Sequence, residues 1–251
     1  ATITLMEKQN RLPKMNILTA ICERLNIPTE RIVENSGSGI NDQFNAIVNE
    51  LIAGKYETAA EALNKIPVKK LESDFDKQRY YYLLGMVQVK SNKIDEAIFN
   101  FELVLTQFAT TSANIYLAMT TAGMALAYYK RDDPERAARL TDRAVRLIDN
   151  KKLIGSLHQW ALIYCQLGEL YSNLGSYKDS KDIVERGIEL CREHDSLFIL
   201  DELYLIRGKD ELALGEDKQA KETLEIARSI SIARRESFVK DEIAAELKKL
   251  K

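Results

Sequence analysis

Three polar side chains, Gln166, Glu169 and Asn173, follow one another at intervals of three and four residues. On an α-helix this spacing places them on one face. A side-chain amide both donates and accepts hydrogen bonds, as a peptide backbone does, so such a face suits an extended peptide ligand. The same side chains could instead pack between neighbouring helices, and the spacing leaves both interpretations open.

The elements that must position these side chains belong to a repeat. Five segments share one pattern of small and aromatic residues. Its fourth copy contains Gly168, Gly175, Tyr177, Ser180, Val184 and Gly187. One small residue recurs at positions 59, 97, 137, 180 and 220, at intervals of 38 to 43 residues. A fixed period of this length predicts helical hairpins that stack in series and share a core.

Each copy predicts two helices that approach each other closely. A small residue on the first helix and another twelve positions later leave room for the partner helix. The first-helix positions are Gly85, Ala125, Gly168 and Gly208. The connecting turns are rich in Gly, Asn and Asp, so we expect a left-handed residue after the first helix and a side-chain N-cap on the second. Pro134 stands where a second helix begins and its missing N–H is harmless.

This pattern resembles tetratricopeptide repeats, whose usual unit has about 34 residues. The predicted fold is all-α: a tetratricopeptide-like right-handed superhelix of about five helical hairpins. Residues 237–251 place Ile243 and Leu247 on one apolar face, which predicts a C-terminal capping helix. The chain has only four prolines and few alternating β-branched runs, in agreement with an almost entirely helical protein.

Bulk composition narrows the function classes. The 251 residues include 36 basic and 38 acidic side chains, so the net charge of −2 gives no whole-chain attraction to nucleic acid or membrane. Three scattered cysteines without a CxxC pair fit a reducing cytoplasm. No apolar run approaches the ~18 residues that a membrane span needs. We therefore expect a cytoplasmic protein.

Catalytic motifs are absent from the sequence. His158 and His194 have no Cys or Asp at ligand spacing, and there is no phosphate loop or HExxH motif. We therefore expect no enzymatic activity, no cofactor and no metal site.

The N-terminal residues have a different pattern. Residues 7–13 read EKQNRLP, and residues 14–25 predict a helix with one apolar face, formed by Ile17, Leu18, Ile21 and Leu25. Together they resemble the last part of a lambda-repressor-type helix-turn-helix domain, in which the glutamate matching Glu7 ends the recognition helix. The expected DNA contacts are Thr2, Thr4, Lys8 and Arg11. The start of that domain is missing here, so we expect a fragment of a longer regulator.

Three segments follow from these patterns. Residues 1–34 are the C-terminal part of a helix-turn-helix domain, residues 35–39 (Asn-Ser-Gly-Ser-Gly) are a linker, and residues 40–251 are the repeat domain. The alternative for residues 1–34 is a further helical cap on the repeats.

The first helix of each hairpin lines the concave side of such a stack, and aligning the copies gives candidate peptide contacts. They are Arg79, Tyr82, Met86, Met119, Ala122, Leu126, Tyr129, Gln166, Glu169, Asn173 and Lys209. Lys90, Cys165 and Glu202 fall on the same side. Met and Leu would accept apolar side chains of the peptide. For Leu162, Leu205 and Ile206 we favour packing between hairpins.

The two parts together resemble the peptide-sensing regulators of Gram-positive bacteria, the Rap–Rgg–NprR–PlcR–PrgX family. The PlcR-type branch is the most similar, through RLPKMNILTAICERLNIP and QLGELYSNLGSYKDS. The resemblance implies a quorum-sensing transcription regulator that binds a short signalling peptide in the concave groove. It also implies a homodimer formed through the repeats, and binding to operator DNA in the full-length protein only.

Two groove positions depart from that branch. An asparagine on the first helix of the fourth unit holds the peptide backbone there, and Gln166 stands at the matching position. A polar residue of the third unit is replaced by Leu126. We therefore expect a different peptide and a different clamp.

Two other functions stay open. One is a tetratricopeptide-repeat interaction scaffold, although Arg79, Tyr82 and Met86 do not supply the Lys and Asn that grip a terminal carboxylate. The other is a phosphatase-type peptide-sensing relative without DNA binding, which has a helical bundle in place of a DNA reader. The EKQNRLP segment argues against the second.

Overall fold

The computed structural model describes residues 15–25, 38–71, 73–108, 114–150, 153–234 and 237–250. Within these ranges the regular structure is helical, apart from one isolated parallel bridge between Asn114 and Ile154. No helix among the described residues is both long and apolar enough to cross a membrane. The chain divides into two compact units, Ala1–Gln43 and Phe44–Lys251.

The described part of the first unit consists of helix α2 (Met15–Leu25) and the first turns of α4 (Ser38–Ile52). The helix predicted over residues 14–25 is confirmed, but the prediction of its apolar face was wrong at one position. Leu18 and Cys22 are buried, whereas Ile17 is 39% exposed. Ser38 and Gly39, placed by the sequence in a linker, begin α4, and residues 35–37 lie outside the described ranges.

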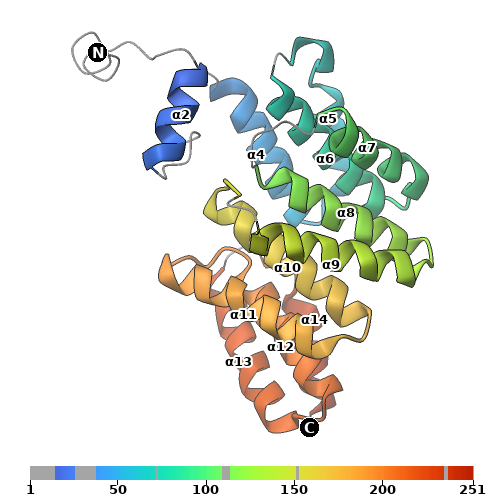
Figure 1. Cartoon of the computed structure of the whole chain (residues 1–251). Helices are drawn as coiled ribbons and strands as arrows, with labels where there is room; N and C mark the ends of the chain where they lie inside the picture. The colour runs from blue at the N-terminus through green and yellow to red at the C-terminus, as the bar shows by residue number, and fades with distance from the viewer. Residues whose placement is uncertain are drawn as a thin grey trace. The chain divides into compact units, whose positions relative to one another are not determined.

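The second unit is a series of helical hairpins, which Figure 1 shows following one another in chain order. The hairpins are α4 with α5 (Tyr56–Asn64), α6 (Asp74–Lys90) with α7 (Ile94–Thr106), α8 (Tyr116–Lys130) with α9 (Pro134–Asn150), α10 (Leu157–Asn173) with α11 (Tyr177–Glu193), and α12 (Leu200–Ala213) with α13 (Asp217–Ala233). A short 3-10 helix, η1 (Val68–Lys70), precedes α6. Helix α14 (Lys240–Lys249) packs on α13 and buries Ile243. The predicted all-α stack of five hairpins with a capping helix is confirmed.

The first helices of neighbouring hairpins form a continuous layer. Helix α8 packs against both α6 and α10, and α10 packs against α12. In the described part of the chain, no comparable contact joins α7 to α9, α9 to α11, or α11 to α13. The first helices are therefore closer together than the second helices, so the stack curves with the first helices on its concave side. The exposed side of α6, α8, α10 and α12 is called the inner face below.

Small residues hold each hairpin together, as predicted. A Cβ added at Gly168 would lie 2.3 Å from Val184 Cγ2, and one at Gly208 would lie 2.7 Å from Leu224 Cγ. Ser180, the small residue of the second helix, donates a hydrogen bond from Oγ to the carbonyl oxygen of Gly168 at 2.9 Å. The two helices therefore touch through backbone and small side chains, with no space for a larger residue.

The turns between the paired helices contain the predicted left-handed residues, but most lack the predicted side-chain N-cap. Their left-handed residues are Gly54 (φ 67°), Asn92 (φ 60°), Asp132 (φ 64°), Gly175 (φ 78°) and Gly215 (φ 76°). The expected side-chain N-cap forms at Asp133, whose Oδ1 accepts a hydrogen bond from the Arg136 N–H at 3.1 Å. It was wrong for Lys93, Ser176 and Glu216, which make no capping hydrogen bond. Their ψ values of 50° to 66° depart from the extended backbone of most N-caps.

Gly168→Ala tests the close contact. The added methyl would meet the branched side chain of Val184, so we expect a loss of about 1–3 kcal/mol in the free energy of unfolding from overpacking. The better helix propensity of alanine opposes this by about 1 kcal/mol. Val184→Ala in the same chain opens the needed space, so the double variant should be more stable than the sum of the single losses predicts. Urea unfolding of the wild type, the two single variants and the double variant measures the four free energies of unfolding. Strictly additive losses would contradict the contact.

Candidate functional site

Equivalent positions of the repeats place charged side chains on the inner face. The position five residues after the small residue of the first helix is occupied by Lys90, Lys130 and Asn173 in three successive hairpins. The position one residue after it holds Glu169 on α10 and Lys209 on α12. Lys130 was missed, because the sequence comparison selected its neighbour Tyr129. The five-residue offset shared with Lys90 and Asn173 is the signal that identifies it.

Lys90 and Lys130 lie close together at the ends of α6 and α8. The Lys130 ammonium donates a hydrogen bond to the carbonyl oxygen of Val89 at 3.2 Å, which holds it beside the residue that precedes Lys90. Partial burial lowers the pKa of Lys130, the charge of Lys90 lowers it further, and Glu169 opposes both. Two like charges on neighbouring helices are thus held side by side.

Glu202, in the first turn of α12, faces the same region. Its side chain is 23% exposed. Burial raises the pKa of the Glu202 carboxyl to about 7, Glu169 adds to the increase, and Lys90 opposes it. The Cys165 thiol of α10 donates to Glu202 Oε2 at 4.0 Å. Burial, together with Glu202 and Glu169, raises the pKa of this thiol well above its usual value, so it stays protonated.

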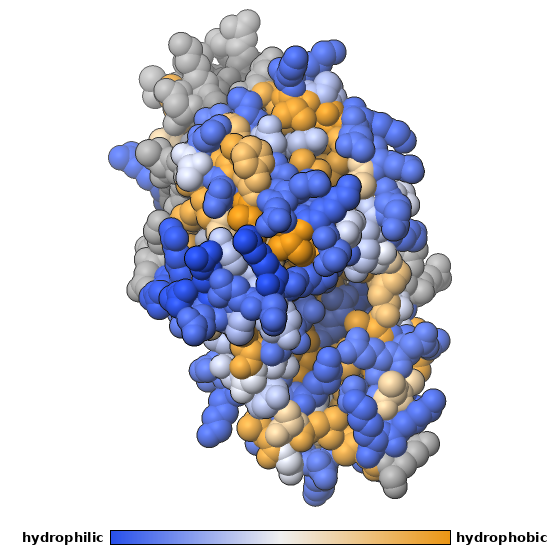
Figure 2. Space-filling model, turned by 90° about the vertical axis from the view of Figure 1, so that its right-hand side faces the viewer, coloured by the Kyte–Doolittle hydropathy of each residue, from blue (hydrophilic) through white to orange (hydrophobic). Residues whose placement is uncertain are grey.

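These residues, Lys90, Lys130, Glu169 and Glu202, are called the inner-face charged cluster. They come from α6, α8, α10 and α12, so every first helix from the second hairpin to the fifth contributes one. Figure 2 shows one side of the molecule, on which hydrophilic and hydrophobic side chains alternate and a recess lies near the middle.

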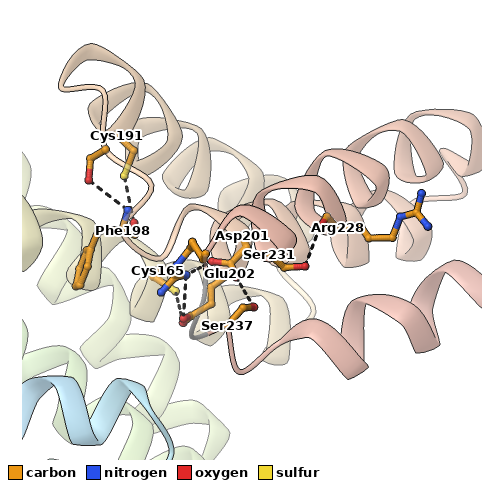
Figure 3. Close-up of polar contacts among 10 residues, drawn as sticks. Cys165, Cys191, Phe198, Asp201, Glu202, Arg228, Ser231 and Ser237 are labelled. Atoms are coloured by element: carbon orange, nitrogen blue, oxygen red, sulfur yellow. Dashed lines mark hydrogen bonds and ion pairs between the residues drawn. The ribbon is translucent and has the colours of Figure 1, made fainter.

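A second polar network fixes the start of α12. The buried Asp201 carboxylate pairs with Arg234 and accepts a hydrogen bond from Ser237 Oγ at 2.6 Å (Figure 3). Arg234 Nη1 also lies 3.8 Å from Glu202 Oε1. Ile199, immediately before α12, has a left-handed backbone (φ 46°), which is strained for a β-branched residue. The connection between α13 and α14 therefore anchors the helix that presents Glu202.

Several predicted peptide contacts are covered by the protein itself. Tyr82, Met119, Ala122 and Leu126 are at most 6% exposed. Their rings and aliphatic chains pack between helices, and Tyr82 contacts the rings of Phe101 and Tyr116. The apolar lining expected for an open groove is thus interior here. A role for these four residues in binding a peptide stays a prediction.

Arg79 is also buried, because it joins two hairpins. Its Nη2 donates to Asn45 Oδ1 at 2.6 Å, and its guanidinium lies 4.9 Å from the ring centroid of Phe44. These contacts connect α6 to α4. They give Arg79 a structural role, and its contact with a ligand stays a prediction.

Most of the remaining candidates are more accessible, but Gln166 is buried. Glu169, Lys209, Met86 and Tyr129 are half-buried, and Asn173 is exposed. Gln166 is 9% exposed, and its Nε2 lies 3.8 Å from Met86 Sδ, across α8.

Lys209 forms an ion pair with Glu242 of α14 at 2.9 Å. The expected packing of Leu162 and Ile206 between hairpins is confirmed, because both pack on a core cluster formed by the fourth and fifth hairpins. Leu205 is buried instead against α13 of its own hairpin and Ile243 of α14.

The remaining sequence candidates give no further site. Thr2, Thr4, Lys8 and Arg11 lie outside the described residues. The His158 ring stacks on Phe198 with centroids 4.1 Å apart, and burial lowers its pKa. Among the residues that the structure describes, no three His, Cys, Asp or Glu side chains are placed to hold a metal ion.

The described helices form a helical-repeat fold with tetratricopeptide-like repeats. A tetratricopeptide-repeat family model matches residues 78–111 and 161–194, which contain most of α6 with α7 and of α10 with α11. A comparison with curated protein sequences gives no match.

Solved structures share the architecture at low sequence identity. PlcR of Bacillus thuringiensis, solved with the peptide PapR7 and DNA, has a TM-score of 0.69 and 15% identity, over 99% of this chain and 88% of that one. A tetratricopeptide repeat protein of Parabacteroides merdae has a TM-score of 0.55 and 16% identity, over 98% of this chain and 80% of that one. The apo form of RapI has a TM-score of 0.52 and 14% identity, over 93% of this chain and 64% of that one. These likenesses establish the fold.

The raised pKa of Glu202 predicts a pH-dependent effect on stability. The folded chain holds the proton more tightly than a solvated glutamate, with a pKa of about 7 against 4.5. The free energy of unfolding therefore falls as the pH rises between these values, and the loss is complete above the higher one. Glu202→Gln removes this penalty. We expect the variant to be more stable than the wild type at pH of about 8, on the order of 1–3 kcal/mol, and to lose this advantage at pH of about 5.

Urea unfolding at the two pH values measures the difference. The matched control is Glu189→Gln, at an exposed position of α11. A stability difference for Glu202→Gln that does not grow with pH would contradict the assignment.

Proposed function

We propose that this protein is a peptide-sensing transcription regulator that binds a short linear peptide on its inner face. The observation that carries the proposal is the inner-face charged cluster, built from four successive first helices. A ligand that contacts all four helices must be extended, and a peptide is such a ligand. The exposed amide of Asn173 offers a donor and an acceptor to its backbone.

The likeness to PlcR supports the regulatory part of the proposal. That protein was solved with a peptide and with DNA, and the alignment covers nearly the whole of this chain. In the proposed arrangement, residues 1–34 are the end of a DNA-binding head and residues 40–251 bind the peptide and form a homodimer. Operator DNA is bound by the full-length regulator, through two heads that contact two half-sites.

Blocking the inner face tests peptide binding. Glu169→Trp places a bulky side chain on α10 at the centre of the cluster, and Glu189→Trp places the same side chain on the outer helix α11. Native mass spectrometry after incubation with the peptide fraction of a culture of the source organism detects the complex. We expect wild type and Glu189→Trp to retain the same peptide, and Glu169→Trp to bind it at least about tenfold more weakly, which corresponds to about 1.4 kcal/mol. Equal retention by all three proteins would place the site elsewhere.

A further inference from the structure

The charges of the inner-face charged cluster lie near one another without pairing directly. Among the described residues, no carboxylate lies within 4.0 Å of the Lys90 or Lys130 ammonium, and no cation lies that close to the Glu169 carboxylate. The Glu202 carboxylate has one such neighbour, Arg234, at 3.8 Å. Each group nevertheless acts electrostatically on others of the set, because Lys90 affects Glu202 and Glu169 affects Lys130. The geometry agrees: the Lys130 ammonium lies 3.2 Å from the carbonyl oxygen of Val89, next to Lys90, and the Cys165 thiol, one turn before Glu169 on α10, lies 4.0 Å from Glu202 Oε2.

Several other charged residues of these hairpins form ion pairs. Lys209 pairs with Glu242 at 2.9 Å, and Arg207 pairs with Glu211 at 3.0 Å. Arg186 of α11 pairs with Asp149 of α9 at 2.9 Å. At the cluster, by contrast, Lys90, Lys130 and Glu169 have no ion-pair partner within 4.0 Å among the described residues. A carboxylate placed between two neighbouring ammonium groups offsets their mutual repulsion, and a cation does the same for two neighbouring carboxylates.

We propose that the cluster selects peptides that carry both a carboxylate and a cation, with the carboxylate between Lys90 and Lys130 and the cation against Glu169 and Glu202. This inference rests on the proposed function and names the chemistry of its ligand. The two charges also fix the direction in which the peptide lies, because a reversed peptide brings like charges together. The carboxylate is that of the C-terminus or of an Asp or Glu side chain, and the cation is an N-terminal ammonium or a Lys or Arg side chain.

A mixture of short synthetic peptides of equal length shows whether the termini or the side chains of the peptide supply the two charges. Each has an apolar middle, and each is made with free or blocked termini and with Asp or Lys at varied positions. Affinity selection on the full chain, followed by mass spectrometry, identifies which peptides are retained. Peptides with both charges should be enriched. Amidation of the C-terminus or acetylation of the N-terminus then shows whether a terminus or a side chain supplies each charge.

Substitutions assign the charges to residues. Lys90→Met with Lys130→Met should weaken peptides that carry the carboxylate about tenfold to a hundredfold, and leave their uncharged analogues unchanged. Glu169→Gln combined with Glu202→Gln should weaken peptides that carry the cation by a similar factor and leave their uncharged analogues unchanged. Lys178→Met and Glu189→Gln, at exposed positions of α11, are the matched controls and should change nothing. Lys130→Glu should make the chain prefer peptides with a second cation, a gain of binding that a misfolded protein cannot show.

The outcomes separate the two proposals. Retention of peptides regardless of their charges, or a Lys130→Glu variant with unchanged preference, overturns the charge selection and leaves peptide binding intact. If the wild-type chain retains no peptide from the mixture, the proposed function itself fails.

Discussion

The close contact between the two helices of each hairpin is the constraint on which the rest of the structure depends. At Gly168 and Gly208 the backbone of the first helix touches a side chain of the second, so the distance and register of the pair are fixed. Because the same contact recurs, side chains at equal offsets from the small residue repeat along the inner face. The alignment of Lys90 with Lys130 and of Glu169 with Lys209 follows from this register.

The curvature that brings the first helices together also decides which of their side chains stay accessible. Apolar residues such as Met119 and Leu126 are drawn into the packing between helices, where they stabilise the stack. Lysine and glutamate are costly to bury without partners, so Lys90, Lys130 and Glu169 stay at least partly exposed on the same helices. The inner face therefore presents charges over an apolar interior. Recognition of a ligand on such a surface depends on electrostatics and hydrogen bonds more than on apolar contact.

The fold could be predicted from the sequence because its determinants are local. A small residue at a fixed spacing and a left-handed residue at Gly175 or Asp132 each act within one hairpin. The candidate site could be predicted only in part, since its accessibility depends on how neighbouring hairpins curve. Glu169 and Lys209 were found by their positions in the repeat, whereas the burial of Tyr82 depends on rings from other helices. Arg234, which lies near Glu202, comes from a connection outside the repeat pattern.

Photo-cross-linking tests the central claim most directly, with a peptide retained by the protein and carrying a photoreactive side chain. Digestion and mass spectrometry then locate the attached residue. The inner-face site predicts attachment to α6, α8, α10 or α12, with α8 and α10 labelled by the middle of the peptide. Attachment confined to α7, α9, α11 or α13 would contradict it, because those helices form the opposite side of the stack.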